Sequence, residues 1–248
     1  MIYATPELGK DLGAVSGGLL YIVYSVSALF VSRPTLRWTG AKLSIVIGMA
    51  SMLMYVTTFM IALAVPSVKW YVCVPGAFLG GLGAGLMWPA QGSYYSQSAV
   101  LYAGKHSVSV EEAHINFAGY FATIYLGSEA VGKLLVTLIY LSMRSGGTGS
   151  WQVFAFLVYT VLAWLSTAAV CNIENIGCEH TTDDICHEGI TKYSEHTLWD
   201  MMWGEALAVF RLVKSHDLFF TIVPYQLSFG FCAAFMSYYV DGIVLDSH

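Results

Sequence analysis

The feature that most constrains this chain is the spacing of its charged residues, which leaves six long apolar stretches. Five of them contain no Asp, Glu, Lys or Arg, and the fourth contains only Glu129 and Lys133. A helix that crosses the hydrocarbon core of a bilayer needs about 20 predominantly apolar residues, and each stretch is long enough. The predicted spans are Leu12–Ser32, Leu43–Val68, Trp70–Gly104, Ala113–Met143, Trp151–Cys171 and Leu218–Val240.

The composition agrees with a membrane protein. Hydrophobic residues make up 56% of the 248-residue chain and charged residues only 11%, against about 25% charged residues in an average soluble domain. The net charge of −5 leaves no basic surface for phosphates and excludes a nucleic-acid partner. The sequence therefore predicts an all-α, polytopic transmembrane helix bundle whose surroundings are the lipid bilayer.

The basic residues outside the spans predict the orientation. The first, third and fifth connections hold seven Lys and Arg, and the opposite side holds three, so the positive-inside rule places the odd-numbered connections in the cytoplasm. Three parts follow: five transmembrane helices over residues 1–172, an acidic cytoplasmic loop over 173–217, and one further helix over 218–248. Which membrane holds the protein is left open.

The second half of the acidic loop, Thr197–Lys214, is predicted to be an amphipathic helix. Thr197 can cap it, and one face then carries Trp199, Met202, Trp203, Ala206, Phe210 and Val213. Such a helix next to a span is typical of the membrane interface. A partner-binding helix is the alternative.

Glu129 and Lys133 are the strongest chemical signal. They lie four residues apart within a predicted span, so they share a helix face and can pair. Ionisable groups in hydrocarbon cost about 2.5–3.5 kcal/mol each on insertion scales and usually face a cavity or a partner. An ion or solute pathway and a structural pair between helices are both open.

The third predicted span combines glycines, prolines and polar residues. Small-xxx-small spacing occurs twice, at Gly76/Gly80 and Gly81/Gly85, and predicts close helix packing. Pro75 and Pro89 bracket this run and predict kinks. Beyond them lies a polar cluster that either lines a cavity or marks the helix end leaving the membrane: Gln91, Tyr94 and Tyr95.

No motif indicates an enzyme, a cofactor or a metal site. Four residues of the acidic loop superficially suggest zinc, but their spacing lacks the usual C-x2-C or H-x3-H pairs: Cys178, His180, Cys186 and His187. No P-loop, nucleophile elbow or H-E-x-x-H motif occurs.

The segment Gly81–Tyr95, with the sequence GLGAGLMWPAQGSYY, resembles the fourth-helix signature of the Unc-ninety-three family, the ion-channel-regulatory-protein branch of the major facilitator superfamily. Weaker similarities follow in the same order along the chain. Residues 11–21 resemble the family's second helix, the loop residues Pro34, Gly40 and Lys42 match the loop that follows it, and residues 126–132 and 230–235 resemble its fifth and seventh helices.

The resemblance implies a facilitator-like fold in which this chain supplies helices two to seven of twelve, as expected for a fragment. It also implies a non-enzymatic regulator or adaptor whose partner is a channel or receptor in the membrane. The general facilitator loop carries an acid before its basic residues, and residues 32–42 have none. A secondary transporter that moves a small solute or ion by alternating access is the alternative hypothesis.

Overall fold

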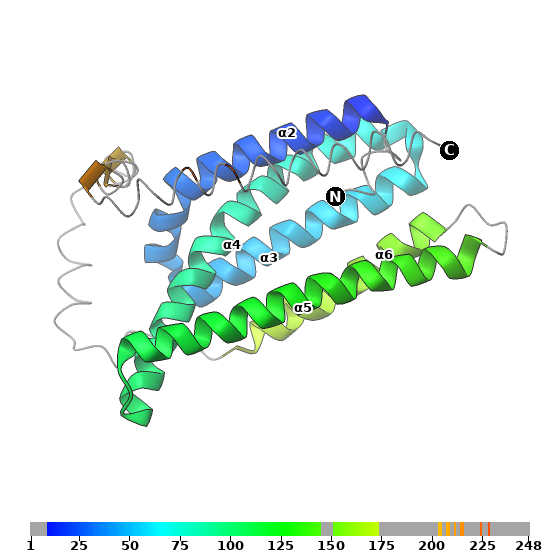
Figure 1. Ribbon diagram of the computed structural model, residues 1–248. Helices are drawn as coiled ribbons and strands as arrows, with labels where there is room; N and C mark the ends of the chain where they lie inside the picture. Colours follow the sequence, from blue (N-terminus) through cyan, green and yellow to red (C-terminus); the bar gives the residue numbers. More distant parts are fainter. Residues whose placement is uncertain are drawn as a thin grey trace.

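The computed structural model describes residues 9–144, residues 151–173 and nine single positions between 203 and 228. Within these residues the secondary structure is helical and contains no strand. The long helices run antiparallel to their neighbours in sequence and form an elongated bundle (Figure 1). The predicted all-α class is confirmed.

The first two long helices, α2 (Lys10–Val26) and α3 (Ser32–Ala64), are joined without a loop. A π-helical segment, η1 (Ser27–Val31), follows α2 directly. The backbone then runs across the end of the bundle before α3 returns along it (Figure 1). The return occurs at Gly40, whose φ of 77° and ψ of 168° interrupt α3 and lie in a region that only glycine adopts readily.

The central helix is α4 (Lys69–His106), which follows the short 3-10 turn η2 (Pro66–Val68). It packs along both α2 and α3. The main core lies between these three helices: Leu12, Leu20, Tyr55, Phe59, Ala62, Cys73 and Ala77. At 38 residues α4 is about 57 Å long, which exceeds the roughly 30 Å hydrocarbon core.

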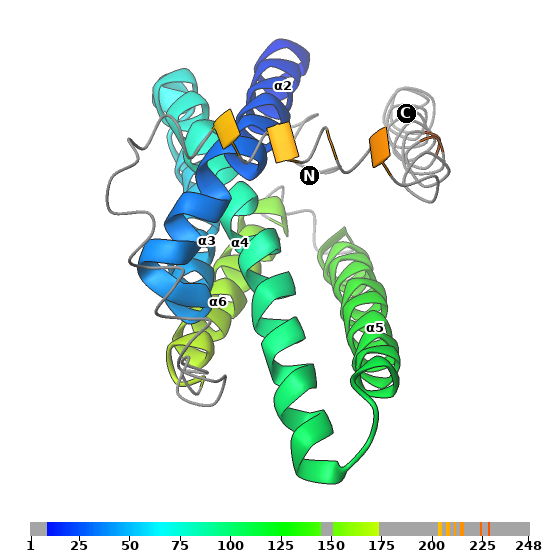
Figure 2. The same ribbon diagram turned by 90° about the vertical axis from the view of Figure 1, so that its left-hand side faces the viewer.

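Two further helices, α5 (Val110–Arg144) and α6 (Trp151–Cys171), complete the described bundle. The turn before α5 uses Ser107 in the left-handed region and Ser109 as the cap, whose Oγ accepts from the Glu112 N–H at 3.1 Å. α5 meets α4 near this turn and then diverges from it (Figure 2), while α6 packs on α3 and α5.

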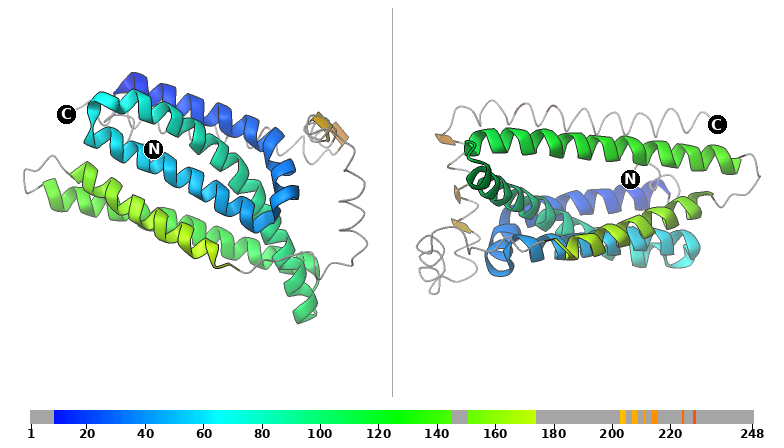
Figure 3. Two further views of the ribbon diagram at one scale, coloured as in Figure 1. Left: turned by 180° about the vertical axis from the view of Figure 1, so that it is seen from behind. Right: turned by 90° about the horizontal axis from the view of Figure 1, so that it is seen from below.

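Three helical stretches of the described chain are long and apolar enough to cross a membrane: Asp11–Ala64, Pro66–His106 and Val110–Ile139. The first of them contains both α2 and α3, which fold back on one another (Figure 3), and Leu157–Cys171 is a shorter apolar helix. The prediction of an integral membrane protein is confirmed. The sixth predicted span, Leu218–Val240, lies outside the described residues except at positions 224 and 228.

Candidate functional site

The glycines in the first half of α4, from Gly76 to Gly85, lie where it crosses its two neighbours, and the two predicted pairs face different helices. Gly76 and Gly80 lie against α3: a Cβ built on Gly76 would stand 2.2 Å from Thr58 Oγ1, and one on Gly80 would stand 2.7 Å from Tyr55 Cγ. No side chain fits in these spaces without moving the neighbour. The α3–α4 crossing therefore depends on the absence of a Cβ.

Gly81 and Gly85 face α2 and η1 instead. A Cβ on Gly81 would lie 2.7 Å from the carbonyl oxygen of Leu20, and one on Gly85 would lie 2.6 Å from Ser27 Cβ. Ser27 is buried here, and its Oγ donates to the carbonyl oxygen of Leu82 at 3.3 Å. The close approach of the helices thus also brings a polar side chain of η1 to the backbone of α4.

A third crossing point, between Gly48 of α3 and Gly83 of α4, was not among the sequence predictions. A Cβ on Gly48 would lie 2.8 Å from the carbonyl oxygen of Gly83, and one on Gly83 would lie 2.7 Å from that of Gly48. Ser44 and Gly48 have small-xxx-small spacing in the sequence, and this was the signal that could have found it.

The prolines of α4 do not break the helix, which continues through Pro75 and Pro89. The polar residues after Pro89, Gln91, Tyr94 and Tyr95, are all half-buried. The Tyr95 hydroxyl donates to the backbone carbonyl of His114 on α5, and the Tyr95 ring lies 6.0 Å from that of Phe117. Tyr95 therefore ties the end of α4 to the start of α5.

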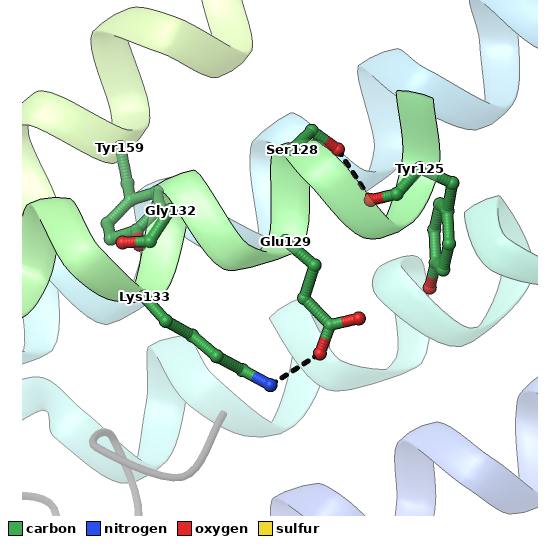
Figure 4. A network of polar contacts seen from close by, with 6 residues as sticks. All are labelled: Tyr125, Ser128, Glu129, Gly132, Lys133 and Tyr159. Carbon is green, nitrogen blue, oxygen red and sulfur yellow. Dashed lines mark hydrogen bonds and ion pairs between the residues drawn. The ribbon is translucent and has the colours of Figure 1, made fainter. Parts of the chain in front are cut away.

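Glu129 and Lys133 form an ion pair on α5, with Lys133 Nζ 2.6 Å from Glu129 Oε1 (Figure 4). Their side chains are 47% and 67% exposed, so the five described helices leave the pair open. Tyr159 of α6 approaches α5 on a different side, and its hydroxyl donates to the carbonyl oxygen of Gly132 at 2.9 Å (Figure 4). This bond fixes α6 against the turn of α5 that carries the pair.

The expected loop of Pro34, Gly40 and Lys42 is not a loop. Pro34 is buried within the helical segment that crosses the end of the bundle, and Lys42 is half-buried just after the turn at Gly40. The side chain of Thr39 bridges this turn, since its Oγ1 lies 2.7 Å from Ser44 Oγ. Helical hydrogen bonds on both sides of one glycine replace the irregular connection that the sequence suggested.

Two predictions fall largely outside the described residues. The structure does not describe the four loop residues considered for zinc, Cys178, His180, Cys186 and His187. It also leaves out most of the predicted amphipathic helix Thr197–Lys214. Where the chain is described, no group of three His, Cys, Asp or Glu side chains is placed to hold a metal ion. Trp203 of Thr197–Lys214 is described, and its ring meets Phe30 of η1 edge-on at 5.9 Å, a contact that the sequence did not predict.

Comparison with known proteins gives one family. Residues 7–235 match the family model described as ion channel regulatory protein UNC-93. UNC93-like protein 3 of Arabidopsis thaliana is 27% identical over 172 residues, which are 69% of this chain and 35% of that protein. Protein unc-93 homolog A of Xenopus laevis is 30% identical over 131 residues, 53% of this chain and 27% of that protein.

A third relative is the putative potassium channel regulatory protein unc-93 of Caenorhabditis elegans, 25% identical over 134 residues, 54% of this chain and 18% of that protein. The matched part thus spans about a third or less of the length of these relatives. No solved structure matches the chain significantly.

Proposed function

This chain belongs to the UNC-93 family of ion channel regulatory proteins, and from that premise we propose that it acts as a non-enzymatic regulator of an ion channel within the membrane. The observation that carries the proposal is the family match over residues 7–235. A relative whose name states the regulation of potassium channels supports a potassium channel as the partner to test first.

The surface proposed to meet the channel is the open side of α5. The most apolar stretch of α5 has no buried residue among the described helices, and the ion pair of Glu129 and Lys133 lies exposed within it. Facing lipid, these groups are costly. A polar group on a transmembrane segment of the partner would compensate this cost, which favours a helix contact at this position.

Co-expression of the full chain with a potassium channel tests the proposal. We expect the two proteins to co-purify in mild detergent and the chain to change the whole-cell potassium current. The double variant Glu129→Gln/Lys133→Met should weaken both effects, while the matched variant Gly127→Ala, at an open position of the same helix, should leave them unchanged. Unaltered currents and no co-purification across a panel of potassium channels would contradict the proposal.

A secondary transporter is the second candidate, and the same ion pair favours it, because charged side chains inside membranes often line ion or solute pathways. Flux into proteoliposomes containing the full chain distinguishes the two functions. Transport that Glu129→Gln abolishes would support the transporter. Channel modulation without flux of any tested solute or ion would support the regulator.

A further inference from the structure

The π-helical segment η1 combines a buried polar contact with open apolar side chains. The backbone N–H of Ser32 bonds to the carbonyl oxygen of Ser27, five residues back, and such π-helical turns occur frequently at functional sites. Ser27 is buried, and its Oγ donates to the carbonyl oxygen of Leu82 on α4. Leu29, by contrast, is exposed, and Phe30 is half-buried. η1 is therefore bonded to α4 and presents apolar surface on its outer side.

A segment far away in the sequence contacts this outer side. The ring of Trp203 lies 5.9 Å from that of Phe30, at 85°, which is the edge-to-face arrangement that aromatic pairs prefer. The described residues between 203 and 215 are helical, so Leu207, four residues after Trp203, lies on the same helix face. The short coloured pieces of this segment begin beside η1 (Figures 1 and 3). The segment thus offers η1 an apolar face.

The path of the chain brings this segment to η1. The long helices run antiparallel to their neighbours, so α2, α4 and α6 all run toward the end of the bundle that carries η1 (Figure 1). Residues 174–202 join the described end of the α6 region to Trp203. The contact between Trp203 and Phe30 therefore needs a connection across one end of the bundle only, and the occupant of the outer side of η1 comes from the same chain.

We propose that η1 is an intramolecular docking site for the helical segment of residues 203–215, with Trp203 as the anchor on Phe30. Helices that dock on a protein surface use apolar side chains about one turn apart, and Trp203 and Leu207 have this spacing. Tryptophan is also one of the residues that most often carry the energy of such contacts. The η1 segment of this chain then takes the place of the separate partner considered for Thr197–Lys214.

The packing of η1 on α4 makes it a rigid platform for this docking. A Cβ built on Gly85 would lie 2.6 Å from Ser27 Cβ and 2.9 Å from the backbone nitrogen of Ala28, so the two backbones are as close as a glycine permits. A shift of η1 toward α4 is blocked by this approach, and a shift away from α4 would break the bond of Ser27 to Leu82. A segment docked on η1 is therefore attached to the glycine-packed core of α2, α3 and α4.

Photo-crosslinking of the full chain in mild-detergent micelles tests the proposal directly. Photoreactive benzoylphenylalanine in place of Phe30 should join this position to the tryptic peptide that contains Trp203, as identified by mass spectrometry. The matched control carries the same photoreactive residue in place of Tyr21, which is also aromatic and exposed. It lies about 14 Å from Phe30 along the helix axis and should not give this product.

Trypsin cleavage after Arg211 and Lys214, which are both exposed, measures how often the segment is released, because cleavage requires the helix to open locally. An edge-to-face aromatic pair changes such an equilibrium by about two- to tenfold. Phe30→Ala and Trp203→Ala should each speed cleavage by this factor. The double variant should be no faster than either, because both changes remove the same contact. Trp38→Ala, which removes another exposed ring from this end, should leave the rate unchanged.

Three results would overturn the proposal. One is a crosslink from position 30 to lipid or to another protein without the Trp203 peptide. Another is acceleration in the double variant equal to the product of the two single effects, since the two rings would then act independently. The third is cleavage of Trp38→Ala as fast as that of Trp203→Ala, which would indicate a general loosening of this end. If an alanine variant does not fold, the crosslink decides, because it keeps an aromatic ring at position 30.

Discussion

The crossing of Gly48 and Gly83 allows the helix packing to be tested by one methyl group. In Gly83→Ala the new carbon would lie 2.7 Å from the carbonyl oxygen of Gly48 and 2.7 Å from Ser51 Cβ. Favourable separations between such atoms are about 3.5–4.0 Å. Neither neighbour belongs to the flexible end of a side chain, so α3 and α4 would have to separate by roughly 1 Å.

The size of the effect follows from two opposing terms. Overpacking of this kind costs about 1–3 kcal/mol, and alanine in place of glycine within a helix returns about 0.5–1 kcal/mol. The net loss in the free energy of unfolding is then about 0–2.5 kcal/mol. Gly92 of the same helix has no atom within 4 Å of an added Cβ. Gly92→Ala should therefore show only the gain in helix propensity, without the cost of overpacking.

The difference between Gly83→Ala and Gly92→Ala isolates the contact between the helices, because the helix-propensity term is common to both. We expect a difference of about 1–3 kcal/mol when the full chain in mild-detergent micelles is unfolded by titration with sodium dodecyl sulfate and followed by tryptophan fluorescence. If Gly83→Ala proves as stable as Gly92→Ala, α3 and α4 do not meet closely at this position and the argument is wrong.

Three further predictions use the same unfolding titration or an insertion assay. Gly40→Ala should lower the free energy of unfolding by about 1–3 kcal/mol although no atom crowds the site, because a φ of 77° strains any other residue. Stability equal to that of the wild type would show that the turn can relax. Tyr159→Phe removes the hydrogen bond to Gly132 and should lower the free energy of unfolding by about 0.5–1.5 kcal/mol. An unchanged free energy would show that this bond does not stabilise the fold. Glu129→Gln removes the carboxylate of the ion pair but keeps the charge of Lys133 within the span, so translocon insertion of α5 should be poorer than in the double variant with Lys133→Met. The reverse order would argue against pairing.

Much of the bundle could be predicted because lipid imposes simple rules. The spacing of charges located α2 to α6, because a helix that crosses a bilayer needs about 20 predominantly apolar residues. A helix is stable there because it satisfies its backbone hydrogen bonds within itself. The pairing of Glu129 with Lys133 followed from their i,i+4 spacing. These features depend on residues close together in the sequence.

The contacts between distant residues could not be predicted in this way. Nothing in the sequence indicates that Gly76 faces α3 while Gly81 faces α2, because that depends on the rotation of α4 about its axis. The same holds for Phe30 and Trp203, which are separated by more than 170 residues. Residues 32–39 resembled a loop because they are polar, yet they form a helix that lies across the bundle end with its polar face outward.

The packing of α4 explains why stability and function can be tested at separate places. Glycines on two of its faces allow α2 and α3 to approach closely, and the ring contact of Trp88 with Tyr125 ties α5 to α4 one turn before Glu129. Beyond that contact α5 diverges from α4 (Figure 2) and is braced by Tyr159 of α6. The ion pair therefore lies outside the glycine-packed core, and changing it should alter what α5 binds without loosening α2, α3 and α4.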